Sequence, residues 1–421
     1  MERLPGFRDF YPEPLPNQDV WSADARNYIF EKWRAVARSY AFREYDGPPI
    51  EPLELYTTKS GEEIVGQLYN FTDKGNRDVA LRPEMTPTLA RLVAAHERNY
   101  KKPIKWFALP QLFRYERQQK GRLREHFQLN ADILGETDPA ADAELVALLI
   151  DVLRAFGLTA NDFVVRLSSR NAWQEFFSAR CADSAKAFEF YQIVDKLERE
   201  DPKQSGIKLA ALGLSLTEVT DFIKAGSPTR ELNAVVQNLS DRGLADFVKV
   251  DYNVIRGLAY YTGIVFEAFD KKGEFRAIAG GGRYDNLVKL ISGGKANLSA
   301  IGFGMGDVVL LELLKDRNLL PQFDAKLHAF CRIEDEALRG ESLQLIQTLR
   351  EAGFALDYSF IPASSDKQFK RAIESKAIST FKLDRTPTGD LLVRLKNLRT
   401  REEMTLIPSE VGNLFRSFGA L

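Results

Sequence analysis

The sequence predicts an α+β protein of two domains, in which a mainly antiparallel sheet flanked by helices is followed by a smaller C-terminal α/β domain. The chain has 421 residues, which exceeds the length at which a single hydrophobic core keeps growing. Short strand patterns separated by turns precede residue 132, as in antiparallel pairs. Beyond about residue 323, strand and helix patterns alternate as in a compact α/β unit.

The first elements follow from spacing and turn residues. Residues 19–40 have the apolar spacing of an amphipathic helix, and a strand-like segment follows toward residue 52. Residues 68–84 predict a hairpin that turns at Lys74-Gly75. A helix is expected to begin near Thr86-Pro87, because proline suits the first turn of a helix.

The middle of the chain contains a strong helix and a predicted insertion. Residues 138–156 form the strongest helical pattern, from an acidic turn with proline to Gly157. Residues from about 170 to 245 read as an inserted helical module. Strands return at 248–269 and at the glycine run 280–282, and a helix follows GFGMG before Pro321. The larger domain is therefore predicted over residues 1–320 and the smaller one over 324–421.

A polar face stands out between Phe113 and Asp132. If this stretch is a strand, a turn at Lys120-Gly121 and a second strand, period-two alternation places on one face the side chains of Arg122, Arg124, His126, Gln128, Asn130 and Asp132. The opposite face is apolar except for Glu125. The arginines here would repel one another unless an anion joins them. The face suits an enzyme that holds a nucleotide beside a small charged metabolite, and a solvated outer face is the alternative.

Composition limits the class of protein. The 58 basic and 59 acidic residues give a net charge of -1, so contact with nucleic acid would depend on local basic patches. The sequence has no apolar run long enough for a bilayer and no leader pattern, so we expect a cytoplasmic protein without membrane contact. Three histidines and two cysteines offer no ligand spacing for a structural metal, so no metal site is predicted.

Three strings resemble the histidyl-tRNA synthetases, a family of class II aminoacyl-tRNA synthetases. They are LRPEMT at 81–86, FRYER with GRLREHFQ at 113–128, and RGLAYYTG at 256–263 followed by GGGRYDNL. The likeness covers nearly the whole chain. It implies a six-stranded antiparallel catalytic sheet, an inserted helical domain, a C-terminal anticodon-binding domain and a homodimer. The implied activity is that of a histidine-tRNA ligase, which uses ATP with Mg²⁺ to activate L-histidine and then transfers it to tRNA(His).

The resemblance also implies roles for single residues. Arg114 and Arg256 would be catalytic, as cations beside the α-phosphate where charge builds in the transition state. The implied histidine-binding residues are Glu84, Thr86, Arg114, Gln128, Asp132, Arg256, Tyr260 and Tyr261. A carboxylate and a phenol could pair with the two imidazole nitrogens, and Tyr261 is the favoured phenol, since adjacent residues of an extended segment face opposite ways. The implied ATP-binding residues are Arg114, Glu116, Arg122, His126 and Phe127, with His126 or Phe127 as the ring on adenine.

Plainer interpretations stay open for several of these residues. Glu84 could be a strand-end carboxylate paired with Arg82. The glycines at 280–282 could form a mere turn, or could let the backbone approach a small substrate closely. Arg283 and Asp285 could form a structural pair or touch substrate. Pro49 and Glu51 are expected to shape a dimer interface.

The chain departs from the family pattern at three positions. Val309 stands where the third motif presents an arginine that grips the ATP phosphates, Asp132 replaces glutamate, and Ala259 replaces aspartate. These losses raise a second hypothesis, a non-charging paralogue that serves as the histidine-sensing regulatory subunit of ATP phosphoribosyltransferase. The complete C-terminal unit, with basic residues at 366–376 and 393–401, and the retained arginines favour the synthetase. A class II synthetase for another amino acid is less favoured, because LRPEMT and RGLAYY are histidine-type strings.

Overall fold

The computed structural model describes residues 2–12, 21–60, 62–115, 123–256, 260–323 and 327–417, with the backbone alone at 59, 60 and 62–64. The chain divides into two compact units, Met1–Leu320 and Pro321–Leu421. In the described part, no helix has the length and apolar character needed to cross a membrane.

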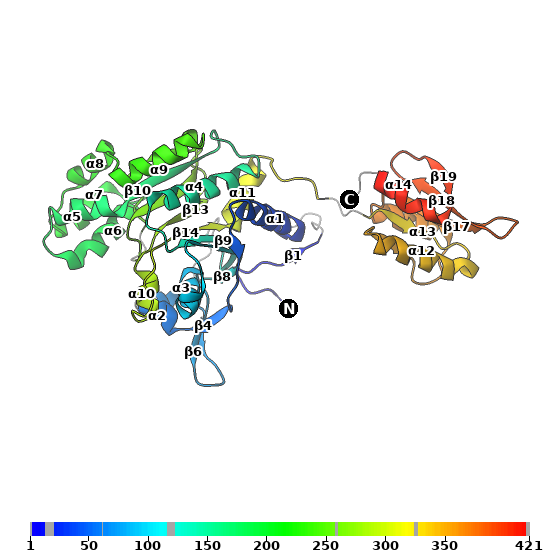
Figure 1. Cartoon of the computed structure of the whole chain (residues 1–421), viewed down its shortest axis with the longest axis horizontal. Helices are drawn as coiled ribbons and strands as arrows, with labels where there is room; N and C mark the ends of the chain where they lie inside the picture. Colours follow the sequence, from blue (N-terminus) through cyan, green and yellow to red (C-terminus); the bar gives the residue numbers. More distant parts are fainter. Residues whose placement is uncertain are drawn as a thin grey trace. The chain divides into compact units, whose positions relative to one another are not determined.

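A nine-stranded sheet, counted over the described residues, forms the centre of the larger unit (Figure 1). Its order is β11-β10-β12-β13-β14-β9-β7-β3, and β8 also pairs with β9. The strands are β3 (Arg43–Glu44), β7 (Ile104–Ala108), β8 (Gln111–Phe113), β9 (Glu125–Leu134), β10 (Phe163–Ser169), β11 (Val248–Val250), β12 (Ile264–Asp270), β13 (Ala279–Arg283) and β14 (Ala300–Gly306). The six strands from β10 to β7 run antiparallel, which confirms the predicted sheet. Parallel strands β11 and β3 extend it at its two ends.

Three helices pack together over one face of this sheet (Figure 1). They are α1 (Ala23–Ser39), α4 (Pro139–Arg154) and α11 (Asp307–Asp316). In α1 the buried residues recur every four positions, from Ala25 to Ala37, and the Ser22 hydroxyl caps its first turn by accepting from Ala25 N at 3.2 Å. The predicted start at residue 19 is therefore too early. Asp138 caps α4, and Gly157 has a φ of +89°, as the predicted helix end requires.

Smaller elements surround this layer. Strands β4 (Ile50–Pro52), β6 (Asp78–Leu81) and β5 (Asn70–Thr72) form a second sheet, and the predicted hairpin β5-β6 is confirmed. Helix α3 begins at the predicted Thr86. The remaining elements before residue 100 and after β13 are β1 (Phe10–Tyr11), β2 (Trp21–Ser22), α2 (Glu54–Ser60), η1 (Glu62–Gln67), α3 (Thr86–His96), η2 (Glu97–Asn99) and α10 (Leu287–Ile291).

Helices fill the segment between β10 and β11, where the helical module is predicted (Figure 1). Aromatic rings form its core, with Trp173 and Phe190 fully buried and their ring centroids 5.6 Å apart. The elements are α5 (Arg170–Ser178), η3 (Ser184–Lys186), α6 (Ala187–Lys196), α7 (Pro202–Ala211), α8 (Leu216–Ala225), α9 (Arg230–Asp241) and η4 (Ala245–Phe247).

The C-terminal unit is built on one sheet of order β16-β15-β17-β18-β19. The predicted alternation of strands and helices is confirmed from β15 to β18, whereas β19 and α14 are not predicted from the sequence. Strand β19 is short and its side chains are exposed or only half-buried, so it lacks an apolar signal. The elements are β15 (Ala329–Cys331), η5 (Glu336–Leu338), α12 (Arg339–Glu351), β16 (Leu356–Tyr358), α13 (Ser365–Glu374), β17 (Ser379–Arg385), β18 (Leu391–Asn397), β19 (Glu403–Leu406), η6 (Pro408–Glu410) and α14 (Val411–Ser417).

Candidate active site

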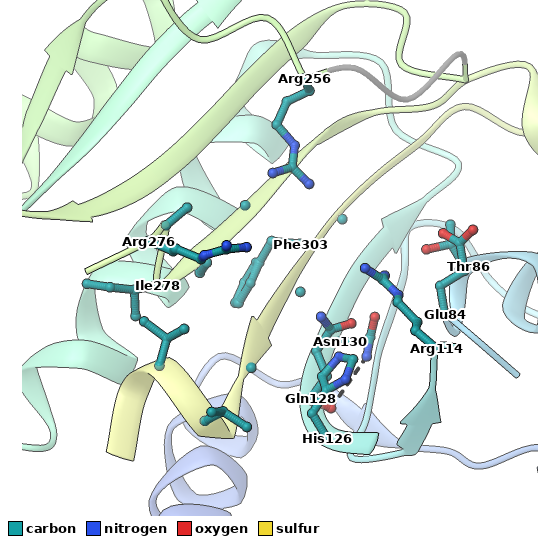
Figure 2. A pocket seen from close by; sticks show the side chains of 18 of the residues that line it. Glu84, Thr86, Arg114, His126, Gln128, Asn130, Arg256, Arg276, Ile278 and Phe303 are labelled. Carbon is teal, nitrogen blue, oxygen red and sulfur yellow. Dashed lines mark hydrogen bonds between the residues drawn. The ribbon is translucent and has the colours of Figure 1, made fainter. Parts of the chain in front are cut away.

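A pocket of about 320 Å³ lies over the middle strands of the large sheet (Figure 2). This volume falls within the rough range of 300–1,000 Å³ that is usual for small-molecule sites. The predicted substrate residues Glu84, Thr86, Arg114, His126, Gln128, Asp132, Arg256, Tyr260 and Tyr261 all line it. Its wall also contains residues that the sequence did not predict as ligands, among them Asn130, Arg276, Ile278, Tyr284, Phe303 and Val308.

On the floor of the pocket, strand β14 presents glycines beside the polar side chains of β9. In the register of β9 and β14, Asp132 lies opposite Gly302, Asn130 opposite Gly304 and Gln128 opposite Gly306. A Cβ atom on Gly302 would lie 1.8 Å from Asp132 Oδ1, and one on Gly304 would lie 2.7 Å from the Gln128 amide. The glycines therefore give the polar side chains of β9 the space in which they lie.

The glycine run 280–282 continues this floor. The hypothesis of a mere turn is wrong, because these residues belong to strand β13. Gly280 lines the pocket, where a Cβ atom would lie 2.4 Å from Arg256 Nη1. The glycines of β14 thus make room for the β9 side chains, and Gly280 of β13 makes room for Arg256.

The polar face predicted for the second strand is present, but the strand begins later than predicted. His126, Gln128, Asn130 and Asp132 line the pocket, whereas Arg124 precedes β9. The first strand also ends early, at Phe113, although Arg114 N still donates to Arg124 O at 2.9 Å. Glu116, Arg117, Arg122 and the turn at Lys120-Gly121 lie outside the described residues.

Asp132 is buried at the pocket floor, where its pKa is raised. Its side chain accepts a hydrogen bond from the Tyr284 hydroxyl at 2.6 Å. Burial raises the pKa of Asp132 to about 7, although the bond from Tyr284 lowers it. The nearby Tyr284 and Tyr45 stay neutral in this range, because burial raises the pKa of both.

This raised pKa makes stability depend on pH. The folded protein holds a proton at Asp132 that the unfolded chain releases at lower pH, so this stabilising contribution is complete in acid and is lost as pH rises through about 7. We expect the free energy of unfolding of the wild type to fall relative to Asp132→Asn by on the order of 2 kcal/mol between about pH 5 and pH 8. Urea unfolding of both proteins at a series of pH values measures this. If the difference in the free energy of unfolding between the two proteins does not change with pH, the raised pKa of Asp132 is contradicted.

Arg256 enters the pocket from the segment before β12 and is held from two sides. Its guanidinium forms an ion pair with Glu267 of β12 and lies 5.7 Å from the centroid of the Tyr261 ring. Burial lowers the pKa of Arg256, but Tyr261 and Glu267 outweigh this and raise it. Its backbone has a φ of +59°, in the left-handed region that residues other than glycine rarely adopt.

Arg114 comes from the opposite side of the pocket. Its Nε donates to Pro83 O at 3.1 Å, which ties it to the LRPE string. Figure 2 shows the guanidinium groups of Arg114, Arg256 and Arg276 directed toward the same space, with Glu84 and Thr86 beyond Arg114. Three cations therefore face one cavity, which suits a ligand with several negative charges.

The LRPE string and the two tyrosines meet at this end of the pocket. Tyr260 donates to Glu84 Oε2 at 3.3 Å, and the Tyr260 and Tyr261 rings lie 4.7 Å apart. Arg82, the structural partner considered for Glu84, pairs with Asp46 at 3.1 Å. The prediction that only one tyrosine faces the pocket is wrong, because both precede the start of β12 at Ile264, in irregular backbone.

Of the two rings considered for adenine, His126 lines the pocket and Phe127 does not. Phe127 points to the opposite face of β9, where its ring meets Phe10 at 5.9 Å and Phe30 at 5.1 Å. The suggestion that Phe127 stacks on the base is therefore not supported by its position. Val309 does line the pocket, and Ala259 lies outside the described residues.

A buried ion cluster explains the isolated Glu125. Arg8 Nε donates to Glu125 at 2.5 Å and its Nη1 donates to Asp307 at 2.8 Å, and all three side chains are buried. Asp307, which follows GFGMG, also accepts from Phe127 N at 3.0 Å. The cluster joins the N-terminal segment to the start of β9 and of α11, directly behind the pocket floor.

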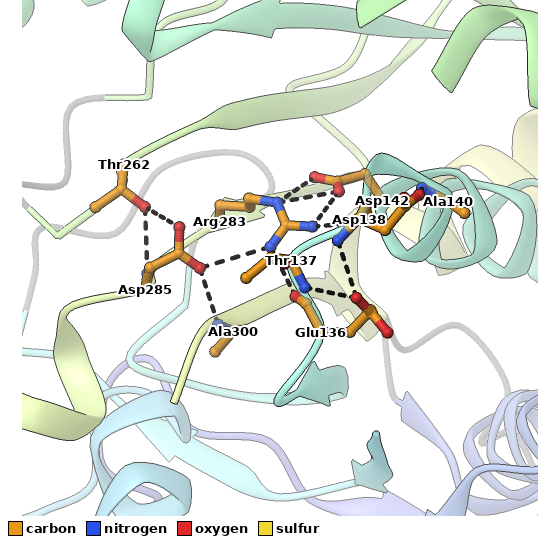
Figure 3. A network of polar contacts seen from close by, with 9 residues as sticks. All are labelled: Glu136, Thr137, Asp138, Ala140, Asp142, Thr262, Arg283, Asp285 and Ala300. Atoms are coloured by element: carbon orange, nitrogen blue, oxygen red, sulfur yellow. Dashed lines mark hydrogen bonds and ion pairs between the residues drawn. The ribbon is translucent and has the colours of Figure 1, made fainter. Parts of the chain in front are cut away.

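Arg283 and Asp285 are structural (Figure 3). The Arg283 guanidinium donates to both carboxylate oxygens of the buried Asp142, at 3.0 Å from Nε, and to Glu136 O at 3.0 Å. Asp285 lies 3.6 Å away and accepts from the hydroxyl of Thr262 at 3.0 Å. Neither residue lines the pocket, and the network instead joins β13 to the start of α4.

Among the described residues, no group of three or more His, Cys, Asp or Glu side chains is arranged to hold an ion.

Comparison with known proteins agrees on one family. The family model described as histidyl-tRNA synthetase matches residues 18–307. A histidine-tRNA ligase from Opitutus terrae is 43% identical, over 99% of this chain and 98% of its own length. One from Leptospira biflexa is 38% identical, over 97% of this chain and 96% of its own.

Solved structures share the fold. The histidyl-tRNA synthetase from Nostoc sp. PCC 7120 superimposes with a TM-score of 0.76 at 21% identity, over 97% of both chains. A structure from Bacillus halodurans, described as an ATP phosphoribosyltransferase regulatory subunit/histidyl-tRNA synthetase, gives a TM-score of 0.70 at 21% identity, over 88% of this chain and 96% of its own. At this identity the likeness concerns the fold alone.

Proposed function

This chain belongs to the histidyl-tRNA synthetase family, and from this premise we propose that its pocket joins L-histidine to ATP and that the chain then transfers the histidine to tRNA(His). The convergence of Arg114 and Arg256 on one polar pocket carries the proposal. The histidine carboxylate attacks the α-phosphate, pyrophosphate leaves, and negative charge builds between the two guanidinium groups. Such a role in translation places the enzyme in the cytoplasm.

The regulatory-subunit hypothesis is not favoured. The sequence relatives that cover nearly the whole chain are ligases. The structure described with both names shares only the fold with this chain.

The end of the pocket near the tyrosines suits histidine. Glu84 and Thr86 would receive the substrate's α-ammonium group, since a carboxylate and a hydroxyl both accept hydrogen bonds. Asp132, Gln128 and a tyrosine hydroxyl would pair with the imidazole nitrogens. Buried polar groups of this kind reject an analogue that leaves them unpaired, by a larger factor than an apolar wall could.

The other end of the pocket suits the nucleotide. His126 would stack on adenine, while Glu116 and Arg122, outside the described residues, would meet the adenine amino group and the distal phosphates. Mg²⁺ would enter with the ATP as part of the substrate, held mainly by the phosphates. We propose that Arg276, at the pocket rim, supplies the charge that Val309 cannot.

Arg276 can be tested against a neighbour in its own loop. We expect Arg276→Ala to raise the KM for ATP about 10-fold, because a charge-assisted hydrogen bond to phosphate is lost, and to leave the KM for histidine within about twofold. Lys272→Ala removes a cation that pairs with Asp316 and does not line the pocket, so it should change neither constant. Equal effects of the two substitutions on ATP would contradict a specific role for Arg276.

The proposed reaction is tested by exchange of labelled pyrophosphate into ATP. We expect exchange with histidine and none with other amino acids, followed by charging of tRNA(His) in the same preparation. If the folded protein binds histidine but supports no exchange, the ligase proposal fails and a histidine sensor becomes the better reading.

The C-terminal unit is the proposed contact for the anticodon. Phe360 and Ile361 are 71% and 75% exposed, and the Arg371 guanidinium lies 5.9 Å from the Phe360 ring. An exposed ring beside a cation suits unstacked bases of a loop. Arg399 and Arg401 are exposed as well, whereas carboxylates of the same unit already pair with Arg371, Arg394 and Lys396.

We propose that two copies associate through the small sheet. Ile50 of β4 and Phe71 of β5, the two strands that flank β6, are 43% and 48% exposed, which is unusual for large apolar side chains in one small sheet. Glu51, expected at this interface, instead points inward and pairs with Arg91 at 2.7 Å. Sedimentation should give twice the chain's mass for the wild type and a shift to the single chain for Ile50→Glu combined with Phe71→Glu. An unchanged mass would contradict this surface.

A further inference from the structure

The first residue of the helical insertion holds the backbone of the segment that carries Arg256. Arg170, at the start of α5, donates from Nη1 to Ile255 O at 3.5 Å and to Arg256 O at 3.3 Å. Its backbone N–H donates to Gly263 O at 2.8 Å. One residue of the insertion therefore donates hydrogen bonds to both ends of the RGLAYYTG string.

These contacts fall on the two peptide groups that set the conformation of Arg256. The Ile255 carbonyl belongs to the peptide before the Arg256 Cα atom, and the Arg256 carbonyl belongs to the peptide after it. Arg256 has a φ of +59°, which costs a residue with a side chain roughly 1–2 kcal/mol. Such a conformation persists where surrounding contacts hold it, and Arg170 provides two of them.

The environment of Arg170 is unusual for an arginine. The residue is only 5% exposed, and within the described part of the chain no carboxylate forms an ion pair with it. Its guanidinium instead lies 3.6 Å from the centroid of the Tyr191 ring of α6. A guanidinium group held against an aromatic ring points its N–H groups in fixed directions. It can therefore hold the carbonyl oxygens that accept from it in fixed positions.

We propose that Arg170 is a positioning residue that acts through Arg256, with Tyr191 fixing the plane of its guanidinium. Neither Arg170 nor Tyr191 lines the pocket, so the insertion contributes to histidine activation without touching the substrate. The expected effect on the reaction rate rests on the proposed function. The hydrogen bonds from Arg170 to the backbone do not depend on it.

The chain supplies a matched control in Arg166. It also joins β10 to the insertion, by an ion pair with Glu198 at 3.2 Å, and its guanidinium also lies over a ring, that of Phe269 at 4.5 Å. It also lies 3.7 Å from Asp251, but among the described residues none of its hydrogen bonds goes to Ile255, Arg256 or Gly263. Arg166→Gln therefore tests the loss of a stacked arginine between strand and insertion without disturbing Arg256.

We expect Arg170→Gln to lower kcat of pyrophosphate exchange by about 30-fold, with KM for histidine and ATP changed by less than about threefold, because a small displacement of a catalytic group costs mainly rate. Arg166→Gln should keep kcat within about twofold. In the Arg256→Ala background, Arg170→Gln should reduce kcat by less than about twofold further, because its effect passes through the missing side chain.

The proposal is overturned if Arg166→Gln lowers kcat as much as Arg170→Gln, or if the losses at Arg170 and Arg256 multiply. Should Arg170→Gln fail to fold, Tyr191→Leu against Tyr191→Phe makes the same comparison, with loss of rate expected only where the ring is removed. Amide hydrogen exchange of the peptide over 252–263 gives a readout without activity, and it should accelerate in Arg170→Gln and not in Arg166→Gln. If the wild type shows no exchange of pyrophosphate into ATP, the proposed function is refuted. The rates of amide hydrogen exchange in the two variants would still decide whether Arg170 holds the backbone of this segment.

Discussion

Replacing Arg256 with alanine is expected to slow histidine-dependent pyrophosphate exchange by about 1,000-fold, the loss typical when one preorganised donor to a developing charge is removed. The guanidinium points into the pocket and its charge cannot be supplied by Arg114 alone, which comes from the opposite side. The effect should fall mainly on kcat, because the charge on the α-phosphate grows only in the transition state.

The fold should survive this substitution. Glu267, which loses its partner, has a side chain that is 18% exposed, so water can solvate part of its charge. Arg242→Ala is a suitable control, since that exposed arginine pairs with Glu144, neither residue lines the pocket, and its loss should leave kcat unchanged. A large decrease in the rate of pyrophosphate exchange with an unchanged melting temperature supports the role of Arg256. A decrease in rate of less than about tenfold would contradict it.

Adding a single methyl group to the pocket floor, at Gly302, is expected to lower kcat/KM for histidine strongly as well. In Gly302→Ala the new Cβ atom would lie 1.8 Å from Asp132 Oδ1, a distance that real structures do not contain. Asp132 must then move and give up its hydrogen bond from Tyr284. We expect kcat/KM for histidine to fall on the order of 100-fold, because the imidazole loses a buried partner.

The same strand provides the control for this prediction. A Cβ atom on Gly306, also in β14 and also lining the pocket, would have its nearest neighbour at 3.9 Å. Gly306→Ala should therefore bind histidine as the wild type does, as measured by calorimetry. Equal loss of histidine binding in both variants would show that the sheet, rather than the space beside Asp132, is what the methyl group disturbs.

Regular elements could be predicted from the sequence because their periodicity is local. The four-residue spacing in α1, the caps of α4 and the alternation from His126 to Asp132 all follow from neighbouring residues. The ends of β8 and β9 were misplaced because the arginines on either side carry no apolar signal that marks a strand end.

Other parts of the site depend on contacts that no local pattern reveals. Tyr260 and Tyr261 share one wall because the backbone before β12 is irregular, so alternation does not apply there. Arg276 is one of several charged residues in its loop, and nothing in the sequence sets it apart. Arg170 resembles an ordinary helix start until its carbonyl partners are seen. The position of Phe127 follows from aromatic partners in the first thirty residues, which are distant in sequence.

The cluster of Arg8, Glu125 and Asp307 has a consequence for how the protein is made. Arg8 is synthesised 299 residues before Asp307, its buried partner that opens α11 near the end of the larger unit. Until α11 has been synthesised, Arg8 and Glu125 lack Asp307, the third member of the ion cluster. We therefore expect the larger unit to complete its folding late in translation, when its first and last segments meet. Replacement of Arg8 should therefore delay this last step of folding.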